Sequence, residues 1–324
     1  MKAGTRRGVR LLGSAVTLGA CLAGIGSAGA QETAGTTEAT LIAAGDIANC
    51  VDLRGARATA RLVEQIQGTV LTLGDNVSPD GSEQQFRDCY DPTWGRVRDR
   101  TRPSAGNHDY HTPGAAAYFR YFGAAAGEPG KGYYSYDLAG WHVVALNSNC
   151  SEIGGCETDS PQEAWLRADL AAHPSACTLA YWHHPLFSSG SNPSHAQHPE
   201  MKRVWQDLYA AGATIVLNGH EHNYERFAPQ DPDGQPDAVH GIRQIVVGVG
   251  GKGFDPLTHP QPNSEARNDG TFGVLKLTLR PLDYEWAFIA VGEQGFADSG
   301  TGACHIPPIP PTPQAAPSQP GPAK

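Results

Sequence analysis

Short apolar runs recur along the middle of the chain and are rich in Val, Leu, Ile and Ala. The runs are nearly continuous rather than alternating, which is typical of strands buried on both faces of a sheet. We expect six such strands, at residues 40–45, 69–74, 141–147, 177–182, 214–219 and 243–250. Two later apolar segments, 272–279 and 284–291, predict an antiparallel hairpin.

Amphipathic segments lie between several of these runs and predict helices. One begins with Ser160 as N-cap and Pro161 at the first helical position, and Glu163 completes a capping box. In two others, apolar residues recur at helical spacing. These residues are Leu62, Val63 and Ile66 in segment 56–67, and Met201, Val204, Trp205 and Leu208 in the segment that ends on Gly212. Strands that alternate with helices predict a layered α/β protein with mixed sheets.

The first thirty residues have the pattern of an export signal. A basic start precedes an apolar run of small residues, and Ala28-Gly29-Ala30 forms an A-x-A cleavage site. Two variants stay open: a twin-arginine signal at Arg6-Arg7, and a lipoprotein box that would leave Cys21 as a lipidated N-terminus. We expect a secreted, extracellular protein or a cell-surface lipoprotein, without a membrane span.

The rest of the chain reads as one domain with short extensions. We expect an export signal at 1–30, a polar leader at 31–39, one folded domain at 40–304 and a Pro-rich tail at 305–324. The tail is too poor in apolar residues to pack.

The charge balance argues against a nucleic-acid partner. The predicted leader holds four basic residues and no acidic one, so its removal takes the formal net charge from −9 to −13. Such a chain has no basic surface for nucleic acid or for an anionic membrane. An anionic substrate would have to be attracted by something other than this balance.

Six of the seven cysteines lie outside the leader, and an even number in an exported chain predicts disulfides. Cys150 and Cys156 close a short loop and form the first expected pair. The simplest remaining pairs are Cys50–Cys89 and Cys177–Cys304. A cysteine metal site is the alternative, but the chain contains no C-x-x-C.

Polar side chains follow the predicted strands at the points where the strands end. The relevant stretches are Gly45-Asp46, Gly74-Asp75-Asn76, Gly106-Asn107-His108-Asp109, His183-His184-Pro185 and Gly219-His220-Glu221-His222. Open α/β sheets build their sites at the carboxyl ends of their strands. Carboxylate, amide oxygen and imidazole are ligands for divalent and trivalent metals, so the sequence predicts a metal site at this edge.

The five motifs, in this order, resemble those of the calcineurin-like metallophosphoesterases. The phrases GHEHNYER and HHPLF are most similar to the catalytic domain of the purple acid phosphatase branch, and the resemblance covers about residues 40–290. It implies a four-layer α/β/β/α sandwich of two mixed sheets. It also implies a small phosphate-ester substrate, hydrolysed by a hydroxide that bridges two metal ions, with Fe, Zn or Mn as the metals.

The resemblance also assigns the site residues. It implies that Asp46, Asp75 and His222 hold the first metal, that Asp75 bridges, and that Asn107, His183 and His220 complete the second. Only His183 has a proline two residues later, as the His-x-Pro motif requires.

Other residues of these motifs are expected to serve the substrate or to support the ligands. His108 would face the substrate as general acid, with Asp109 orienting its ring. His184 is a candidate substrate contact, followed by His195 and His198. Tyr224 and Arg226 would support the His220–His222 pair from behind. Residues 248–253, GVGGKG, predict a glycine-rich turn that brings the backbone close to the site.

Two positions depart from the family. A tyrosine ligand of the purple enzymes is replaced by Ser78, and a histidine used by many other members is replaced by Ala48. The first metal therefore has one protein ligand fewer than either pattern supplies, and a water, Ser78 or Asn49 is expected to fill the gap.

We expect an exported phosphomonoesterase with two metal ions. One alternative is a phosphodiesterase acting on cyclic nucleotides, nucleic acid or glycerophosphodiesters with the same metals. The other is a non-catalytic relative, which the depleted first metal site favours and the retention of His108 opposes.

Overall fold

The computed structural model describes residues 38–190, 198–292 and 295–305. The predicted export signal with Cys21, most of the polar leader and nearly all of the Pro-rich tail lie outside these residues. The described part of the chain contains no helix long and apolar enough to cross a membrane.

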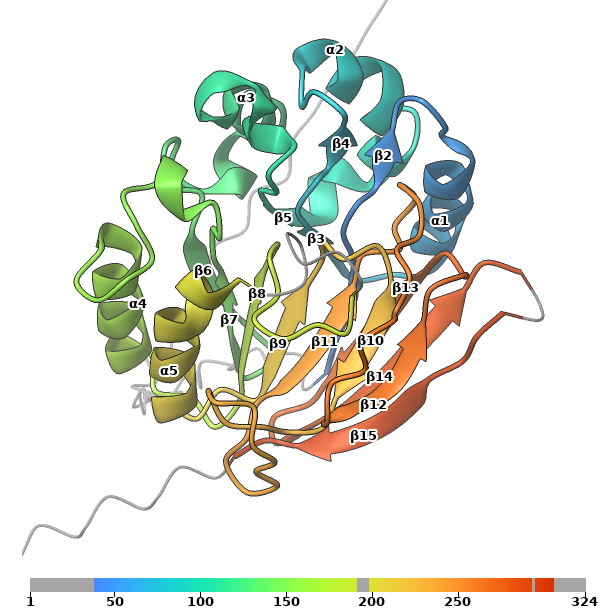
Figure 1. The fold of residues 1–324 in the computed structure, drawn as a ribbon. Helices are drawn as coiled ribbons and strands as arrows, with labels where there is room; N and C mark the ends of the chain where they lie inside the picture. Colours follow the sequence, from blue (N-terminus) through green and yellow to red (C-terminus); the bar gives the residue numbers. More distant parts are fainter. Residues whose placement is uncertain (1–37, 191–197, 293–294, 306–324) are drawn as a thin grey trace, which may run out of the picture. The chain divides into compact units, whose positions relative to one another are not determined.

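The first of two large sheets combines the start and the end of the described chain (Figure 1). Its strand order is β15-β14-β13-β1-β3-β5. The strands are β1 (Ala39–Ala44), β3 (Thr69–Leu73), β5 (Thr101–Ser104), β13 (Gly273–Leu279), β14 (Asp283–Ala290) and β15 (Ser299–Ala303). β1, β3 and β5 are parallel, whereas β13 pairs with β1 and β14 in antiparallel fashion, so this sheet is mixed.

The second sheet is also mixed, with the order β12-β10-β11-β9-β8-β7-β6. Its strands are β6 (Tyr134–Leu138), β7 (Trp141–Ala145), β8 (Thr178–Trp182), β9 (Ile215–Asn218), β10 (Tyr224–Phe227), β11 (Arg243–Val247) and β12 (Ser264–Asn268). The four central strands β7, β8, β9 and β11 are parallel. A separate two-stranded ladder joins β2 (Ala48–Asn49) to β4 (Val77–Ser78).

Helices cover the outer faces of the two sheets (Figure 1). α1 packs against β13 of the first sheet, and α4 and α5 lie side by side against the second. The α-helices are α1 (Arg54–Gln65), α2 (Glu83–Gln85), α3 (Ala116–Phe122), α4 (Pro161–Ala172) and α5 (Lys202–Ala210). Short turns of other helix types are η1 (Phe86–Tyr90), η2 (Trp94–Arg100), η3 (Asp109–His111), η4 (Pro113–Ala115), η5 (Gly123–Ala126), η6 (Cys150–Glu152) and η7 (Pro199–Met201).

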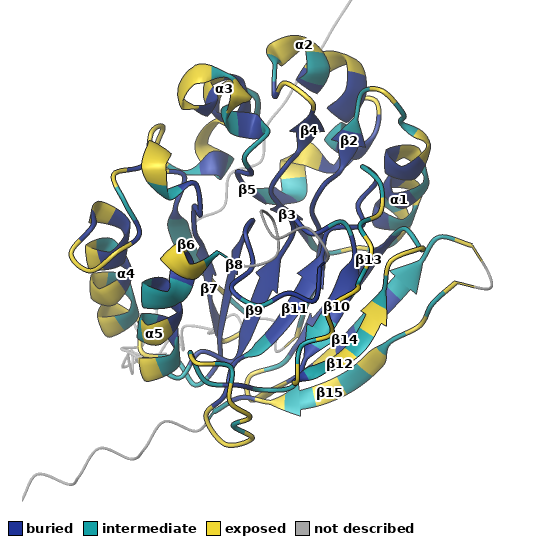
Figure 2. Ribbon diagram, viewed as in Figure 1, coloured by how far each residue is buried: buried dark blue, intermediate teal, exposed yellow. Residues whose placement is uncertain are grey.

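Strand alternation divides the core into two clusters. Along β7, Val143 and Ala145 pack between the sheets, whereas Val144 packs against the layer of α4 and α5. β8 and β9 follow the same period of two, which explains why both faces of these strands carry apolar residues. Figure 2 shows these central strands as continuously buried and the helices α4 and α5 as buried on one side. The predicted four-layer arrangement of two mixed sheets is confirmed.

The six predicted strands and the late hairpin correspond to β1, β3, β7, β8, β9, β11 and the β13–β14 pair. β5, β6, β10, β12 and β15 have no counterpart among the strands predicted from the sequence. These strands are short or carry many polar residues, because most of them lie at or near sheet edges where only part of the strand is buried. The apolar positions predicted for α5 are all buried.

The predicted capping box of α4 is wrong in its partners. Ser160 is the N-cap residue and Pro161 follows it, but the Ser160 hydroxyl makes no capping hydrogen bond. The Glu163 carboxylate instead accepts a hydrogen bond from the backbone N–H of Asp159. Its other oxygen accepts from the Arg203 guanidinium of α5, so Glu163 both caps α4 and joins the two helices.

All three predicted disulfides are present. Cys150 and Cys156 enclose a loop with a sequence separation of 6, and Cys177–Cys304 joins β8 to the end of the described chain across a separation of 127. Cys50–Cys89 links the β2 region to η1. Three disulfides fit an oxidising compartment, but export of the chain stays a prediction.

Cys150–Cys156 and Cys177–Cys304 close loops of very different length, and this difference gives a stability prediction. A cross-link restricts the unfolded chain more when it closes a longer loop. Replacing Cys177 and Cys304 by Ser should therefore cost about 5 kcal/mol of unfolding free energy, and replacing Cys150 and Cys156 about 2 kcal/mol. Urea denaturation of both double variants would measure the difference, and equal losses would contradict it.

Candidate metal centre

The carboxyl ends of strands from both sheets meet at one place. The loops after β1 and β3 are joined by hydrogen bonds from Asp46 N to Gly74 O, 3.1 Å, and from Ile47 N to Asp75 O, 3.0 Å. The backbone N–H of His220, after β9, donates to Asp46 Oδ2 at 2.7 Å and so connects the second sheet to the first. The motifs that contain Asp46, Asp75 and His220 therefore meet at one edge.

Three of the predicted ligands have strained backbones. Asp46, Asp75 and His220 lie in the left-handed region, with φ of 56°, 48° and 70°. Such a conformation costs on the order of 1–3 kcal/mol in a non-glycine residue and persists where the surrounding structure enforces it. Here it turns each side chain back toward the strand ends, which is what a binding site at this edge needs.

His183 is oriented for coordination by its own hydrogen bond. Its Nδ1 lies 2.7 Å from Leu73 O, and because a carbonyl only accepts, Nδ1 carries the proton. The lone pair of Nε2 then faces Asn107 Oδ1 at 3.1 Å and Asp75 Oδ1 at 3.4 Å. A side chain at Gly74, whose φ is 81°, would come within 2.4 Å of this ring, so the glycine before Asp75 lets the two elements approach.

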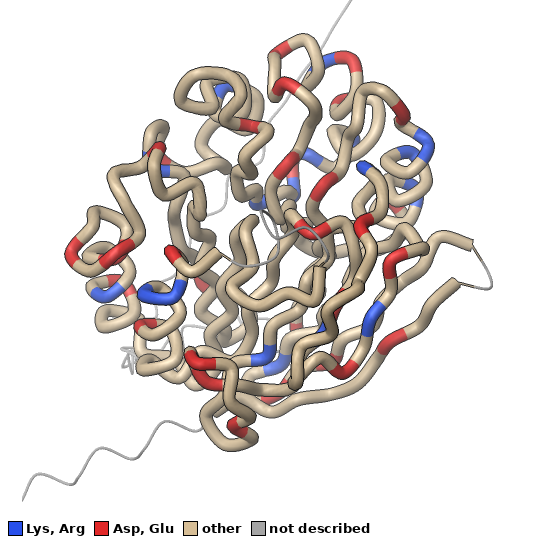
Figure 3. Tube along the Cα trace, viewed as in Figure 1, with Lys and Arg blue, Asp and Glu red and all other residues tan. Residues whose placement is uncertain are grey.

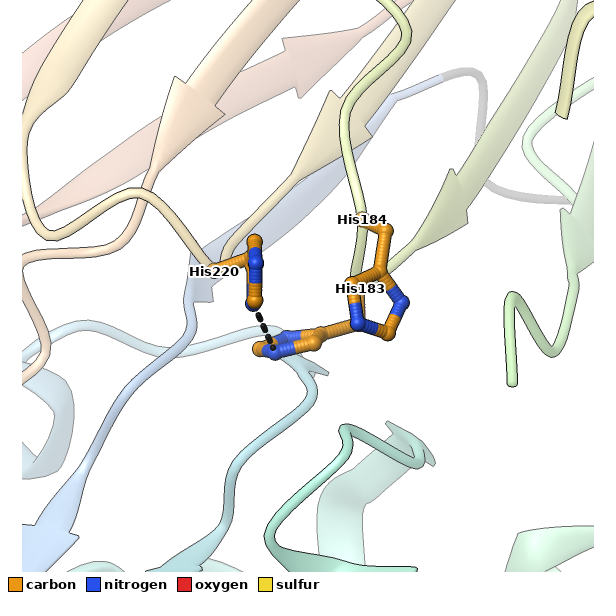
Figure 4. Close-up of side chains that lie close together, drawn as sticks. All are labelled: His183, His184 and His220. Atoms are coloured by element: carbon orange, nitrogen blue, oxygen red, sulfur yellow. Dashed lines mark hydrogen bonds between the residues drawn. The ribbon is translucent and has the colours of Figure 1, made fainter. Parts of the chain in front are cut away.

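His220 completes this group, with Nδ1 3.1 Å from His183 Nε2 (Figure 4). Two imidazole nitrogens, an amide oxygen and a carboxylate oxygen converge here from separate strand ends. This donor set suits a divalent metal, so Asp75, Asn107, His183 and His220 fit the predicted second site.

His184 also lies close to these donors. One ligand atom from each of His183, His184 and His220 falls within 4.8 Å of the others. Nδ1 of His184 lies 2.8 Å from the Ser148 hydroxyl, which also accepts from the His184 backbone N–H at 3.0 Å. Its ring is 4.4 Å from that of His220, centroid to centroid, so His184 borders the second site.

The first site is built differently. Asp46, Asp75 and His183 bring one ligand atom each within 4.8 Å of one another, and His222 Nε2 lies 3.3 Å from Asp46 Oδ1. The other ring nitrogen of His222 lies 3.1 Å from Asp255 Oδ2. A carboxylate behind a ligand histidine fixes its tautomer and orientation, so Asp255 supports His222.

Lys252 also reaches the first site. Its ammonium donates to Asp75 Oδ2 at 2.9 Å and lies 3.9 Å from Asp46 Oδ1. Of the two residues expected to fill the ligand gap, Asn49 uses its side-chain amide on the backbone. The Asn49 amide donates to Lys252 O and accepts from Val51 N, and Ser78 is buried in the β2–β4 ladder.

The electrostatics follow from burial and from neighbouring charges. Burial alone would raise the pKa of Asp75, but His183, Lys252 and His108 outweigh it and hold that pKa well below the usual range. Burial, together with His183 and His184, lowers the pKa of His220 well below its ordinary value. A carboxylate and neutral imidazoles are the protonation states that bind metals.

His108 lies over this edge as expected, but Asp109 does not orient it. The His108 Nδ1 faces Pro79 O at 2.7 Å, and its Nε2 lies 3.7 Å from Asp75 Oδ2. The buried Asp109 carboxylate instead accepts from the backbone N–H of Gly106 and from both nitrogens of Asn76. The carbonyl of Pro79 therefore orients the imidazole, and Asp109 holds together the two loops that carry Asp75 and Asn107.

The support expected from Tyr224 and Arg226 is also different. The Tyr224 hydroxyl donates to Asp298 at 2.7 Å, as does the Arg226 guanidinium. Arg226 also stacks over Trp286 of β14. Within the described residues, no hydrogen bond joins either side chain to His220 or His222, so the pair ties β10 to the first sheet rather than supporting the histidines directly.

A cavity of about 560 Å³ opens beside the second site. Most of its lining residues are polar, among them Asn107, Ser148, His184 and His198, and the lining also includes the carboxylates of Glu152 and Glu200. The rings of His184 and His198 are 4.3 Å apart, centroid to centroid. The third histidine proposed for the substrate, His195, lies outside the described residues. The size suits a small ligand.

Another cluster with metal-binding residue types lies away from this edge. It consists of His142 on β7 with Asp169 and His173 at α4. Both ring nitrogens of His142 are already bonded to carboxylates at 2.9 Å, those of Asp137 and Asp169. Contacts with these two carboxylates account for the position of His142 in this cluster.

Sequence reasoning missed Lys252 and Asp255. Both belong to the segment after β11, where GVGGKG was correctly interpreted as a turn close to the site. Lys252 N donates to Asp46 O at 2.8 Å, and Asp255 N donates to His222 O at 3.0 Å. One indication of a role for Lys252 was present in the sequence, namely its position inside a glycine-rich turn that was expected to lie close to the site.

Comparisons with known proteins agree with this geometry. The family model of the calcineurin-like phosphoesterases matches residues 39–224, more than half of the chain. The chain belongs to this family.

Among characterised relatives, purple acid phosphatase 15 of Arabidopsis thaliana is 30% identical over 231 residues, which is 59% of this chain and 41% of that protein. Purple acid phosphatase 18 of the same plant is 32% identical over 153 residues, 45% of this chain and 34% of that protein. The chain thus spans less than half the length of these two relatives.

A solved structure supports the fold. Purple acid phosphatase PPD1 from yellow lupin (Lupinus luteus) seeds superposes with a TM-score of 0.69 at 17% identity, covering 86% of this chain and 57% of that one. At this identity the likeness concerns the fold alone.

The corrected role of Asp109 leads to a stability prediction. Replacing Asp109 by Ala leaves three buried N–H groups without their acceptor, at a cost of roughly 3 kcal/mol or more of unfolding free energy. Replacing it by Asn keeps an oxygen in the same place and should cost less than half as much. Denaturant unfolding of both variants would measure this, and equal losses would contradict the hydrogen-bonding role.

Proposed function

We propose that this chain is an exported, metal-dependent hydrolase of phosphate monoesters. The observation that carries the proposal is the convergence of Asp46, Asp75, Asn107, His183, His220 and His222 at one edge where two sheets meet. The names of the purple acid phosphatase relatives and the three disulfides support phosphatase activity and export.

The charge distribution fits an anionic substrate only if the site itself attracts it. The formal net charge is −9, and Lys and Arg are spread over several elements (Figure 3). When bound, Fe, Zn or Mn ions would bind phosphate oxygens, offset their charge and acidify a water molecule. Asp75, Asn107, His183 and His220 would hold such an ion, and Asn107 and His184 place it beside the cavity.

His108 is suited to protonate the leaving group. The Pro79 carbonyl fixes a proton on Nδ1, so the proton given to the departing alkoxide comes from Nε2 of the imidazolium. The ring is partly exposed, with 21% of its side chain accessible. It can therefore meet a substrate that lies over Asp75.

Two other functions predict different results in the same assays. A phosphodiesterase would use the same donors but would turn over diesters faster than monoesters. A non-catalytic relative would hydrolyse neither. His108 and the predicted donors of the second site oppose the non-catalytic alternative, and the names of the purple acid phosphatase relatives lead us to favour the monoesterase over the diesterase.

The metal requirement gives the first test. The chain, loaded with metal, should hydrolyse an aryl phosphate monoester faster than the corresponding bis-aryl diester, and chelation should abolish this activity. Replacing Asp75 by Ala should lower kcat/KM by roughly a thousandfold, because the variant loses a donor shared by both sites. Asp283→Ala, an exposed carboxylate on β14, is the matched control and should leave the activity unchanged.

Faster turnover of the diester would favour the phosphodiesterase. Turnover of neither ester by the metal-loaded protein would favour the non-catalytic reading. Full activity in Asp75→Ala would reject the site altogether.

The role of His108 gives the second test. His108→Ala should lower kcat for an alkyl phosphate by roughly a hundredfold to ten-thousandfold. The loss for p-nitrophenyl phosphate should be much smaller, because nitrophenolate leaves without a proton. His240→Ala, an exposed histidine in the turn before β11, is the control and should leave both rates unchanged. Equal losses on both substrates would show that His108 is not the general acid.

A further inference from the structure

Lys252 lies where the family pattern expects the first metal ion. Its ammonium is 2.9 Å from Asp75 Oδ2 and 3.9 Å from Asp46 Oδ1. Both carboxylates are buried, and 16% of the Lys252 side chain is accessible. A lysine is therefore the cation that these two aspartates share.

The backbone holds Lys252 in this place from both sides. Its N–H donates to Asp46 O at 2.8 Å, and its carbonyl accepts from the Asn49 amide at 3.2 Å. Two residues earlier, Gly250 N donates to Gly45 O, and a Cβ at Gly250 would lie only 2.4 Å from that oxygen. The glycine-rich turn thus holds Lys252 against the end of β1, so the backbone of the fold fixes the position of this lysine at the site.

The protein ligands at this place are correspondingly few. Ala48 and Ser78 occupy the two positions where the family pattern would supply another ligand, and Asn49 uses its amide on the backbone. What remains is Asp46, His222 and an Asp75 that is also within reach of the second site. The Lys252 ammonium offsets one of the two carboxylate charges, and it would repel a metal ion placed beside it.

The second site has the opposite character. Asn107, His183 and His220 supply an amide and two imidazoles rather than carboxylates, and His220 Nδ1 lies 3.1 Å from His183 Nε2. The Asp75 oxygen on this side, Oδ1, lies 3.4 Å from His183 Nε2, while Lys252 binds the other oxygen. These donors suit a metal ion, whereas the first site already contains the ammonium of Lys252.

We propose that the Lys252 ammonium takes the place of the first metal ion, so that the chain binds a single ion between Asp75, Asn107, His183 and His220. Lys252 then supplies the second positive charge opposite the substrate phosphate. The inference rests on the proposed function, because it specifies how the same site meets an anionic ester.

Metal stoichiometry tests this directly. Metal-free wild type, Lys252→Met and Lys202→Met would be titrated with Mn²⁺, with bound ions counted by elemental analysis and calorimetry. Met has a similar length but no charge. Lys202 is an exposed lysine paired with Asp233, and its variant is the matched control. Wild type and Lys202→Met should bind one ion at the strand ends.

Lys252→Met should bind a second ion there, with an affinity at least roughly tenfold above that of wild type, because a cation at this distance repels the ion. The electron paramagnetic resonance spectrum should then change from that of an isolated Mn²⁺ to that of a coupled pair, since two ions in such centres lie about 3.5–4 Å apart. Lys252→Gln should behave in the same way and serves if the Met variant does not fold.

Two coupled ions in wild type, or a single ion in every variant, would overturn the proposal and leave the phosphatase assignment standing. No ion bound to wild type at the strand ends would overturn both.

Discussion

Two carboxylates buried side by side need a cation, and the rest of this site is arranged around that need. Asp46 and Asp75 have 0% and 1% of their surface accessible. A buried carboxylate without a positively charged partner costs so much free energy that the protein unfolds or the carboxylate takes up a proton. Each aspartate follows a glycine at the end of a parallel strand, in a left-handed conformation that turns its carboxylate into the space between the loops. The fold therefore creates a strongly negative point that only positive charge can stabilise.

The two sheets supply the charged and polar side chains of the site from opposite sides. The first sheet supplies the aspartates and Asn107, whereas the second supplies His183, His220, His222 and Lys252. The N–H of His220 bonds to Asp46, and the Lys252 ammonium bonds to Asp75, so the contact between the sheets at this edge is itself electrostatic. Binding a metal ion would strengthen that contact, because the donors of the second site also come from both sheets.

Much of this was readable from the sequence, and the exceptions have physical causes. Buried parallel strands are apolar on both faces, so β1, β3, β7, β8, β9 and β11 stood out, as did the polar residues after them. Edge strands such as β12 and β15 mix polar and apolar residues, so they could not be recognised from the sequence. Residue type and order predicted which side chains gather at the edge, but hydrogen-bond partners depend on how loops pack. The contacts predicted for Asp109, Tyr224 and Arg226 therefore differ from those in the structure. Lys252 was missed because a lysine in a glycine-rich turn has no periodic pattern, and its role depends on a contact 177 residues away.

The central claim is that these strand ends hold a metal ion, and anomalous diffraction from crystals soaked in Mn²⁺ or Zn²⁺ tests it most directly. The account predicts an anomalous peak bounded by Asp75, Asn107, His183 and His220, with the Lys252 ammonium still between Asp46 and Asp75. A peak confined to the His142–Asp169–His173 cluster, or no peak at the strand ends at saturating metal, would contradict it.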